Sequence, residues 1–440
     1  MPEISPPAAK ALSILWKNGF ESYLAGGCVR DMIMGIAPKD WDIATSATPQ
    51  QVKAAFHDYE IYETGIKHGT VTVLVDSEPL EVTTFREDIG YSDHRHPDTV
   101  IFNATLKEDV SRRDFTMNAL VFDLERGVID YFGGVQDIGE QTIRCVGDPN
   151  HRFNEDALRI FRALRFSSVL GFRIEQGTAY SVHRNKELLL SVSAERINVE
   201  LTKLICGRNA GSVLLEFADV IGVVVPEIIP MIGFNQHSEY HCFDVWQHTV
   251  GTIENSEPEH ILRWAAFFHD IGKPDCFSLN EYDVGHFYGH AALSNSKADV
   301  VMRRLKFDNA TRELVLTLVA HHDATINPEA RAVKRYLNRL GKDVLHQLLM
   351  LKRADIMGHA PSCHSRVMEI ERTQAVIEQI ISDESCFSLK DLAVDGKDMI
   401  ALGHKGSKIG AALDFLLNAV IDEKVPNERT LLLKYLENAL

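Results

Sequence analysis

The stretch from Leu24 to Thr48 constrains this chain more than any other, because it contains two carboxylates in the pattern Asp-x-Asp. Asp40 and Asp42 lie two residues apart in a predicted strand, so their side chains would point to the same face. Two carboxylates aimed at one point repel each other, and a divalent cation between them relieves that repulsion. The pattern predicts a Mg²⁺ site, although an isolated Asp-x-Asp is more often a solvated strand edge.

A glycine pair precedes these carboxylates. Gly26 and Gly27 would let a ligand approach the backbone closely, and Arg30 follows about one helical turn later. Exposed backbone N–H groups and a guanidinium both favour anions. A Gly-Gly pair alone is most often a turn, but its position next to the carboxylates favours a combined metal and triphosphate site.

The length and composition limit the class of protein. A chain of 440 residues is too long for one ordinary core, so we expect several domains. The sequence shows neither a signal-peptide pattern nor an apolar run long enough to cross a bilayer, which predicts a cytoplasmic protein with no membrane partner. Its 7 cysteines are scattered without a C-x-x-C pair, which favours buried thiols over disulfides or a cysteine zinc site.

The net charge is −16, which argues against non-specific binding of nucleic acid through the overall charge. A nucleic-acid partner would need a locally basic surface. Arginines do cluster, as at Arg112 and Arg113 and along Arg159, Arg162 and Arg165, although each cluster alone is more often a solvated helix face.

The first 140 residues carry signals of both helices and strands. Pro6 to Gly19 and Pro49 to Phe56 have helical periodicity, with Thr48 as an N-cap of the second helix. Thr70 to Val75 and Leu80 to Phe85 are predicted strands. This region therefore predicts a mixed α/β domain.

Two features of this domain bear on the predicted metal site. Glu81, on the second of those strands, would add a third carboxylate if that strand neighbours the one carrying Asp42, although a strand glutamate usually faces solvent. The polar segment from Phe85 to Ile101, with Arg95 near its middle, predicts a mobile loop beside the site.

A short segment from Ser111 to Leu120 follows. It contains Arg112, Asp114 and Asn118 around a few apolar residues, a set that would bind phosphates or ribose, or else form a salt-bridged helix start. From about Gln141 onward, helical periodicity replaces the strand signals.

The helix predicted over Asn154 to Phe166 carries Asp156, Arg159 and Arg162 on one face. Such a pair is normally a surface ion pair, but a fixed carboxylate beside a fixed guanidinium also presents an acceptor next to donors. Cytosine and adenine each offer an amino donor next to a ring-nitrogen acceptor, whereas guanine and uracil offer the opposite pattern. Asp156 and Arg159 would therefore accept C and A and reject G and U.

Taken together, these segments resemble the motifs of class II tRNA nucleotidyltransferases, the CCA-adding enzymes. The resemblance rests on GGCVRD with DWDIAT, TGIKHGTVTV, EVTTFR, RRDFTMNAL, EDALRIFRALRF and ERINVELTKLI, in this order. It implies an α+β protein shaped like a seahorse, with a polymerase-β-like nucleotidyltransferase head over residues 1–140 and an all-α remainder. That remainder would be a neck over 141–205, a body over 206–360 and a tRNA-binding tail over 361–440.

The resemblance also implies roles for individual residues. Asp40 and Asp42 would hold Mg²⁺. The triphosphate would lie at Gly26, Gly27 and Arg30, and the ribose and phosphates at Arg112, Asp114 and Asn118. Glu155, Asp156 and Arg159, with Arg162, would read the incoming base. The implied partners are tRNA, CTP and ATP.

Two related activities compete with complete CCA addition. Bacterial poly(A) polymerases share this head, but TGIKHGTVTV resembles the CCA-adding version of its segment rather than their basic version. Relatives that add only CC lack part of the loop after the third carboxylate, and here that loop, with Arg95, is present.

The second half of the chain contains an ordered set of histidines and aspartates that resembles HD-domain metallophosphohydrolases. The resemblance implies a divalent transition-metal site at His248, His269, Asp270 and Asp355, with His290 and His321 available to a second metal. It raises secondary phosphohydrolase activity as a hypothesis. A hydrolase with a degenerate head and a non-catalytic tRNA-binding protein remain as alternatives.

Overall fold

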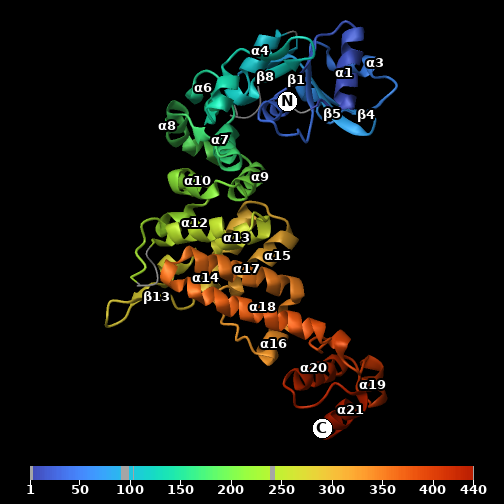
Figure 1. The fold of residues 1–440 in the computed structure, drawn as a ribbon, viewed down its shortest axis with the longest axis vertical. Coiled ribbons are helices and arrows are strands. Elements are labelled where there is room, and N and C mark those ends of the chain that lie inside the picture. The colour runs from blue at the N-terminus through green and yellow to red at the C-terminus, as the bar shows by residue number, and fades with distance from the viewer. Residues whose placement is uncertain (1–2, 91–98, 103, 238–242, 440) are drawn as a thin grey trace. The chain divides into compact units, whose positions relative to one another are not determined.

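The computed structural model describes residues 3–90, 99–102, 104–237 and 243–439. By its internal contacts the chain divides into two compact units, Met1–Pro226 and Glu227–Leu440 (Figure 1). Each unit has its own core, and each is described by itself below.

The first unit begins with an α/β domain. Seven of its described strands form one sheet in the order β3-β4-β5-β2-β1-β8-β9. These strands are β1 (Ser22–Ala25), β2 (Asp42–Thr45), β3 (Glu60–Tyr62), β4 (Thr70–Val75), β5 (Glu78–Thr84), β8 (Leu120–Asp123) and β9 (Gly127–Asp130), and β6 (Arg86–Ile89) pairs separately with β7 (Thr99–Phe102). The helices of this domain are α1 (Pro6–Lys17), α2 (Gly27–Ile33), α3 (Pro49–Ala55), α4 (Leu106–Ser111) and α5 (Gly134–Gly139).

Local sequence signals account for these elements. Thr48 caps α3 in a reciprocal capping box with Gln51, as its position before the helix predicts. Along β4 the side chains of Val71, Val73 and Val75 are fully buried while their neighbours are partly exposed, which confirms the predicted alternation. The mixed sheet with helices confirms the predicted α+β class.

The sheet register brings two of the predicted site strands together. β2 runs parallel to β5, with Asp42 opposite Glu81. β1 lies between β2 and β8, so the turn after β1 is next to the start of β2. This arrangement puts the glycine pair next to the carboxylates, at one end of the central strands β1 and β2.

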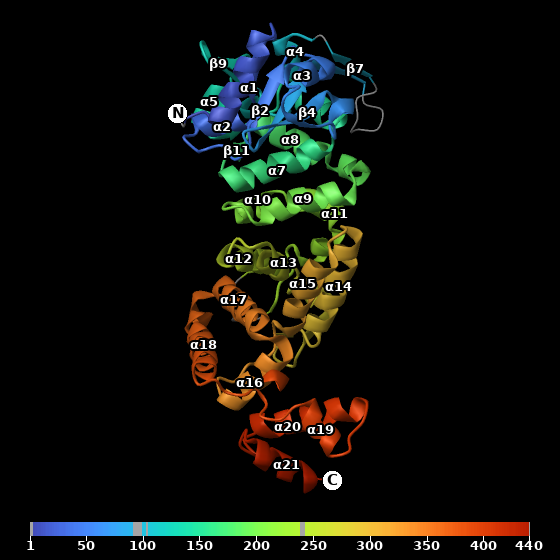
Figure 2. The ribbon, with the colours of Figure 1, turned by 90° about the vertical axis from the view of Figure 1, so that its right-hand side faces the viewer.

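The rest of the first unit is helical apart from one short parallel strand pair, β10 (Thr142–Ile143) with β11 (Arg173–Ile174). Its α-helices are α6 (Pro149–Glu155), α7 (Leu158–Leu170), α8 (Gln176–Arg184), α9 (Ala194–Ile205), α10 (Ala210–Glu216) and α11 (Ala218–Val224). α7 and α9 lie side by side, as Figure 2 shows in green.

The single helix expected over Asn154 to Phe166 is wrong, because two helices occupy this range. α6 ends at Glu155 and α7 begins at Leu158, since Asp156 has an extended backbone with φ −139° and ψ 104°. Its side-chain oxygen accepts the backbone N–H of Leu158 at 3.1 Å. An aspartate that bonds a nearby backbone N–H favours a cap over a helix interior, which explains the break.

The second unit is also mainly helical, with one short hairpin of β12 (Ser278–Leu279) and β13 (Gly285–His286). Its α-helices are α12 (Val245–Asn255), α13 (His260–Phe268), α14 (His290–Arg304), α15 (Asn309–His321), α16 (Ala330–Leu340), α17 (Lys342–Gly358), α18 (Val367–Ser382), α19 (Gly396–Ala401), α20 (Ser407–Ile421) and α21 (Arg429–Glu437). Trp246, Trp264, Phe267 and Phe268 are fully buried and pack on one another.

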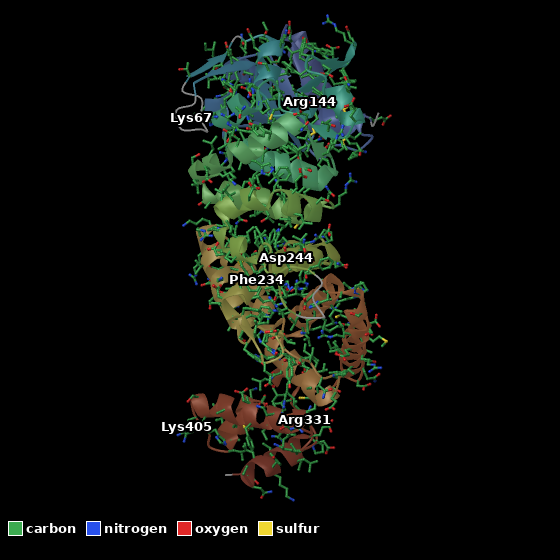
Figure 3. The ribbon with its side chains drawn as sticks, turned by 90° about the vertical axis from the view of Figure 1, so that its left-hand side faces the viewer. Lys67, Arg144, Phe234, Asp244, Arg331 and Lys405 are labelled. Atoms are coloured by element: carbon green, nitrogen blue, oxygen red, sulfur yellow. The ribbon has the colours of Figure 1, made fainter. Side chains whose placement is uncertain are left out.

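Hydrogen bonds tie the beginning and end of this unit into its fold. Asp244, labelled in Figure 3, caps α12 and also accepts the Gly233 backbone N–H at 2.9 Å. Arg331 of α16, labelled in the same figure, donates to Asp422 at the end of α20 at 2.9 Å. Within the described ranges, every helix is too short or too polar to cross a membrane.

Candidate functional site

The three predicted carboxylates lie at one edge of the first unit's sheet. Asp42 is the first residue of β2, Asp40 lies in the bend just before that strand, and Glu81 faces Asp42 from β5. Asp40 and Asp42 line a cavity of about 650 Å³. The Asp-x-Asp spacing predicted that both aspartates lie in the strand. Asp40 instead reaches the site from the bend before it.

The electrostatic environment of Asp42 favours a cation. Burial, together with the nearby charge of Glu81, raises the pKa of Asp42 from 3.8 to about 6, and Arg113 opposes this rise only partly. A divalent ion with oxygen ligands, such as Mg²⁺, would remove this unfavourable charge at Asp42. Asp40 and Asp42 line the cavity, whereas Glu81 is not part of its wall.

The glycine pair, Gly26 and Gly27, lines the same cavity. Gly26 has a φ of 78°, which glycine adopts without strain, and its N–H donates to the carbonyl of Leu120 at 2.9 Å. A Cβ at this position would lie 2.6 Å from a guanidinium nitrogen of Arg113. Gly26 therefore contributes its conformation and its lack of a side chain, because its N–H is already bound within the sheet.

A chain of polar contacts links three of the predicted nucleotide-binding residues. The Arg30 guanidinium donates to the side-chain oxygen of Asn118 at 2.8 Å, and the Asn118 amide donates to Asp114 at 3.0 Å. The other oxygen of Asp114 accepts Nε of Arg162 at 2.7 Å. Burial alone would raise the pKa of Asp114, but Arg162 and Asn118 outweigh burial and lower it to about 2. Asp114 therefore stays ionised and orients both neighbours.

The predicted base-reading residues have partners other than those expected. The Asp156 carboxylate accepts a hydrogen bond from Arg196 of α9 at 3.1 Å, rather than pairing with Arg159. Arg159 pairs with Glu155 and donates to the Arg112 carbonyl at 2.8 Å. Asp156 and Arg159 both line the cavity, whereas Glu155 lies behind Arg159 and holds it in place.

The cavity wall is strongly basic despite the negative charge of the whole chain. Eight arginines and five aspartates line it, with Gly26, Gly27, Asn118, Leu158 and Phe166 completing the wall. The arginines are Arg30, Arg86, Arg112, Arg113, Arg159, Arg162, Arg165 and Arg196, and the aspartates are Asp40, Asp42, Asp88, Asp114 and Asp156. This is the local basic surface that an anionic substrate requires.

Several of these lining residues were not predicted. Arg113 and Arg165 lie in clusters that the sequence makes visible, but Arg86, Asp88 and Arg196 are scattered along the chain and meet only in the fold. Phe166, the last residue of the helix predicted over Asn154 to Phe166, also lines the cavity. The guanidinium carbons of Arg165 and Arg30 lie 3.8 Å and 5.2 Å from the centroid of the Phe166 ring.

Arg95 lies outside the described residues, so its predicted position beside the site stays a prediction.

In the second unit, the structure brings the predicted histidines and aspartates together, except that His322 takes the place predicted for His321. His248, His269, Asp270, His290 and Asp355 converge, and His322 joins them where His321 was expected. His321 instead bonds the carbonyl of Thr317 at 2.9 Å.

His359 is a further residue at this second cluster. Its side chain can share an ion with His248 and Asp355, and the motif that predicted the other ligands does not include it. Burial lowers the pKa of His359 to about 4, which keeps its imidazole neutral and able to bind a metal.

Comparison with known proteins places these features in a family. Residues 22–144 match the family model of the poly(A) polymerase head domain, and residues 286–436 match that of tRNA nucleotidyltransferase domain 2. A CCA-adding enzyme from Limosilactobacillus fermentum is 46% identical over 435 residues, which cover 99% of this chain and 97% of that protein. One from Lactobacillus helveticus is 32% identical over 453 residues, with coverage of 100% and 98%.

A solved structure of the Bacillus stearothermophilus CCA-adding enzyme in complex with CTP superposes with a TM-score of 0.72 at 28% identity, covering 99% of this chain and 98% of that one. The sheet with its carboxylates and its basic cavity defines a nucleotidyltransferase, a class of enzyme that uses a divalent metal ion. Within that class, the chain belongs to the class II CCA-adding enzymes.

Proposed function

We propose that this chain adds C, C and A in turn to the 3′ end of tRNA, using CTP and ATP and no nucleic-acid template. The observation that carries the proposal is that Asp40 and Asp42, the arginines and the base-reading pair Asp156 and Arg159 line the same cavity in the first unit. Transfer chemistry and choice of base would then occur at one site.

Asp40, Asp42 and Glu81 would hold Mg²⁺, which when bound neutralises charge on the reacting phosphate and favours ionisation of the attacking hydroxyl. The 3′ oxygen of the tRNA forms a new bond to the α-phosphorus of the nucleotide while the bond to the β-phosphate oxygen breaks. The proton of the hydroxyl leaves to a carboxylate or to water, and pyrophosphate is released.

The arginines of the cavity wall would bind the triphosphate and the leaving pyrophosphate. Arg30 and Arg162 are held in place by Asn118 and Asp114, so their orientation does not depend on the ligand. A guanidinium that is already oriented loses less entropy on binding a phosphate, which strengthens the contact.

Choice of base would rest on Asp156 and Arg159. Asp156 would accept from the amino group of cytosine or adenine, and Arg159 would donate to the adjacent ring nitrogen. Arg196 and Glu155 support the proposal, because each fixes one member of the pair by an ion pair. A uracil or guanine would present its carbonyl to the Asp156 carboxylate.

The test is incorporation of each labelled nucleotide into tRNA that lacks its CCA end. We expect two C and one A to be added from CTP and ATP, with no net incorporation of U or G. Asp42→Ala should abolish incorporation while leaving tRNA binding near that of the wild type. Appreciable residual incorporation by Asp42→Ala would contradict the metal assignment.

The same assay separates the nearest alternative activity, because a poly(A) polymerase would extend an RNA by many A residues from ATP alone. Addition that stops after one A, and only when CC is already present, would exclude that activity.

We further propose the four-part division predicted above, with head, neck, body and tail. We also propose that the protein acts in the cytoplasm, which fractionation of the producing cells would test.

We propose a second activity for the second unit, namely metal-dependent hydrolysis of phosphoesters. His248, His269, Asp270 and Asp355 would hold a divalent transition metal, since neutral imidazoles with carboxylates suit such ions. His269→Ala should abolish hydrolysis of bis(p-nitrophenyl) phosphate without changing CTP incorporation. Equal hydrolysis by this variant would contradict the proposal.

A further inference from the structure

Three arginines of the nucleotide cavity surround a single aromatic ring. The guanidinium carbons of Arg165, Arg30 and Arg162 lie 3.8, 5.2 and 5.4 Å from the centroid of the Phe166 ring, in that order. A cation within about 6 Å of the centroid is attracted by the electron-rich face of the ring. Phe166 therefore attracts cations from two elements, since Arg30 is in α2 and the other two arginines are in α7.

The Phe166 ring is itself fixed in place. Phe166 is 6% exposed where it lines the cavity, and its ring meets that of the fully buried Phe115 edge to face, with centroids 5.9 Å apart and 86° between the planes. A guanidinium carbon as close to the centroid as that of Arg165 lies over the ring face, because van der Waals radii keep an atom in the ring plane further away. The ring therefore presents an oriented face to this cation.

The three arginine charges repel one another. The Arg165 side chain is largely buried, which lowers the pKa of its guanidinium, and the Glu200 carboxylate, 2.7 Å from its Nε, opposes this effect. The nearby charges of Arg162 and Arg30 lower the pKa of Arg165 further. Attraction to the ring offsets part of this repulsion, and an anionic ligand in the cavity would offset more of it.

We propose that Phe166 is a positioning residue for the nucleotide triphosphate, because its ring holds Arg30, Arg162 and Arg165 together as one phosphate-binding group. The proposal deepens the nucleotide transfer proposed above and rests on it. A carboxylate in place of the ring would also gather the arginines, but it would occupy their N–H donors and repel the phosphates. A neutral ring attracts the cations through its face and leaves their donors and their charge to the ligand.

The electronic role of the ring can be tested while its shape is nearly preserved. Fluorine atoms withdraw electron density from the ring face, so replacing Phe166 with mono-, di- and trifluorinated phenylalanine should weaken its attraction for the arginines in steps. Each full-length protein is titrated with CTP and Mg²⁺ in a calorimeter in the absence of tRNA. We expect the Kd of CTP to rise progressively, by about 2- to 30-fold over the series.

The phosphates of the ligand supply a second readout. CTP, CDP and CMP share one base and one ribose and differ only in their phosphates. Because Phe166 acts through cations that bind phosphate, fluorination should raise the Kd of CTP most and that of CMP least. A general disturbance of the cavity would instead weaken the three ligands equally.

α7 offers a matched pair of substitutions. Phe166→Leu and Phe161→Leu each remove a buried ring from this helix, but Phe161 does not line the cavity. Phe166→Leu should raise the Kd of CTP by about 2- to 30-fold more than that of CMP, whereas Phe161→Leu should not separate the two ligands. Phe166→Tyr keeps an aromatic face and should restore CTP binding to near that of the wild type. The fluorinated proteins keep the test decisive if a leucine variant does not fold.

The outcomes separate this proposal from the one on which it rests. A wild-type protein that binds CTP no more tightly than CMP would overturn both, because the cavity would not hold the triphosphate. A wild type that prefers CTP, together with a fluorinated series of unchanged affinity, would leave nucleotide transfer standing and overturn the role of Phe166. Equal losses of CTP and CMP binding in Phe166→Leu would overturn that role as well.

Discussion

At the scale of single residues, Asp114 organises the nucleotide cavity. Its two oxygens orient Asn118 and Arg162, and through Asn118 they orient Arg30. A buried, ionised carboxylate without hydrogen-bond partners would destabilise the fold, and so would its polar neighbours if Asp114 were removed. One buried carboxylate therefore stabilises the fold and aligns two cations, Arg30 and Arg162, from separate segments.

Asp114→Asn should lower the free energy of unfolding by about 1.5–3 kcal/mol at pH 7, which urea titration would measure. The pKa of Asp114 is lowered from 3.8 to about 2 in the folded chain, so its stabilising contribution is complete above about pH 4. The difference between wild type and variant should shrink as the pH falls from 4 toward 2. A difference that stays constant over this range would contradict the assignment.

Asp156 should decide which bases are accepted. Asp156→Ala removes the acceptor that favours C and A, so discrimination against UTP should fall by about 1–3 kcal/mol, or roughly 5- to 150-fold in relative kcat/KM. Competition between labelled CTP and UTP measures this ratio. Asp148→Ala is a suitable control, since Asp148 caps the neighbouring helix α6 outside the cavity. Unchanged discrimination in Asp156→Ala would disprove the base-reading role.

At the scale of elements, close backbone contact aligns the helices behind the cavity. Gly207, just after α9, lies against Ser168 of α7, where an added Cβ would lie 2.7 Å from the Ser168 carbonyl carbon. α7 also carries Arg159 and Arg162 into the cavity. The spacing of these two helices therefore sets the position of the base-reading groups.

Gly207→Ala should push α9 away from α7, lowering the free energy of unfolding by about 1–3 kcal/mol, and should reduce nucleotide incorporation. Gly410→Ala is the matched control. Nothing lies within 4 Å of a Cβ at Gly410, which is inside α20, so this change should stabilise the protein by about 0.5–1 kcal/mol. Chemical denaturation of both variants measures the change in the free energy of unfolding. The same change in both variants would contradict the packing argument.

At the scale of the whole molecule, charge and ligand sites are distributed unevenly. The chain carries −16, yet the cavity of the first unit is lined by more arginines than acids. The two units, Met1–Pro226 and Glu227–Leu440, are separately compact. The metal site predicted at Asp40 and Asp42 lies in the first, and a cluster of possible metal ligands around His248 and Asp270 lies in the second. Each unit should therefore respond to its own ligand.

Differential scanning calorimetry should resolve two transitions. CTP with Mg²⁺ should raise the midpoint temperature of one transition only, and Asp114→Asn should lower the midpoint of that same transition. Mn²⁺ should raise the midpoint of the other transition only, and His269→Gln should make that transition insensitive to Mn²⁺. A ligand at about 100 times its Kd stabilises its unit by about 2.7 kcal/mol, enough to separate the responses. One transition that responds to both ligands would contradict independent units.

Much of the first unit could be predicted because its signals are local. The capping box at Thr48, the alternation along β4 and the Asp-x-Asp at Asp40 and Asp42 each depend on residues only a few positions apart. The break at Asp156 could not be predicted from helical periodicity, because the periodicity continues through it and only the side-chain bond to the Leu158 backbone interrupts the helix.

The sequence by itself therefore determined the family, the α+β class and the segments that carry chemistry, since motif order and spacing are properties of the chain. Only the tertiary structure decided the partners. It paired Asp156 with Arg196 and Arg159 with Glu155, and it chose His322 over His321. The physical reason is that long charged side chains pair across elements, and successive residues around the end of a helix point in directions about 100° apart.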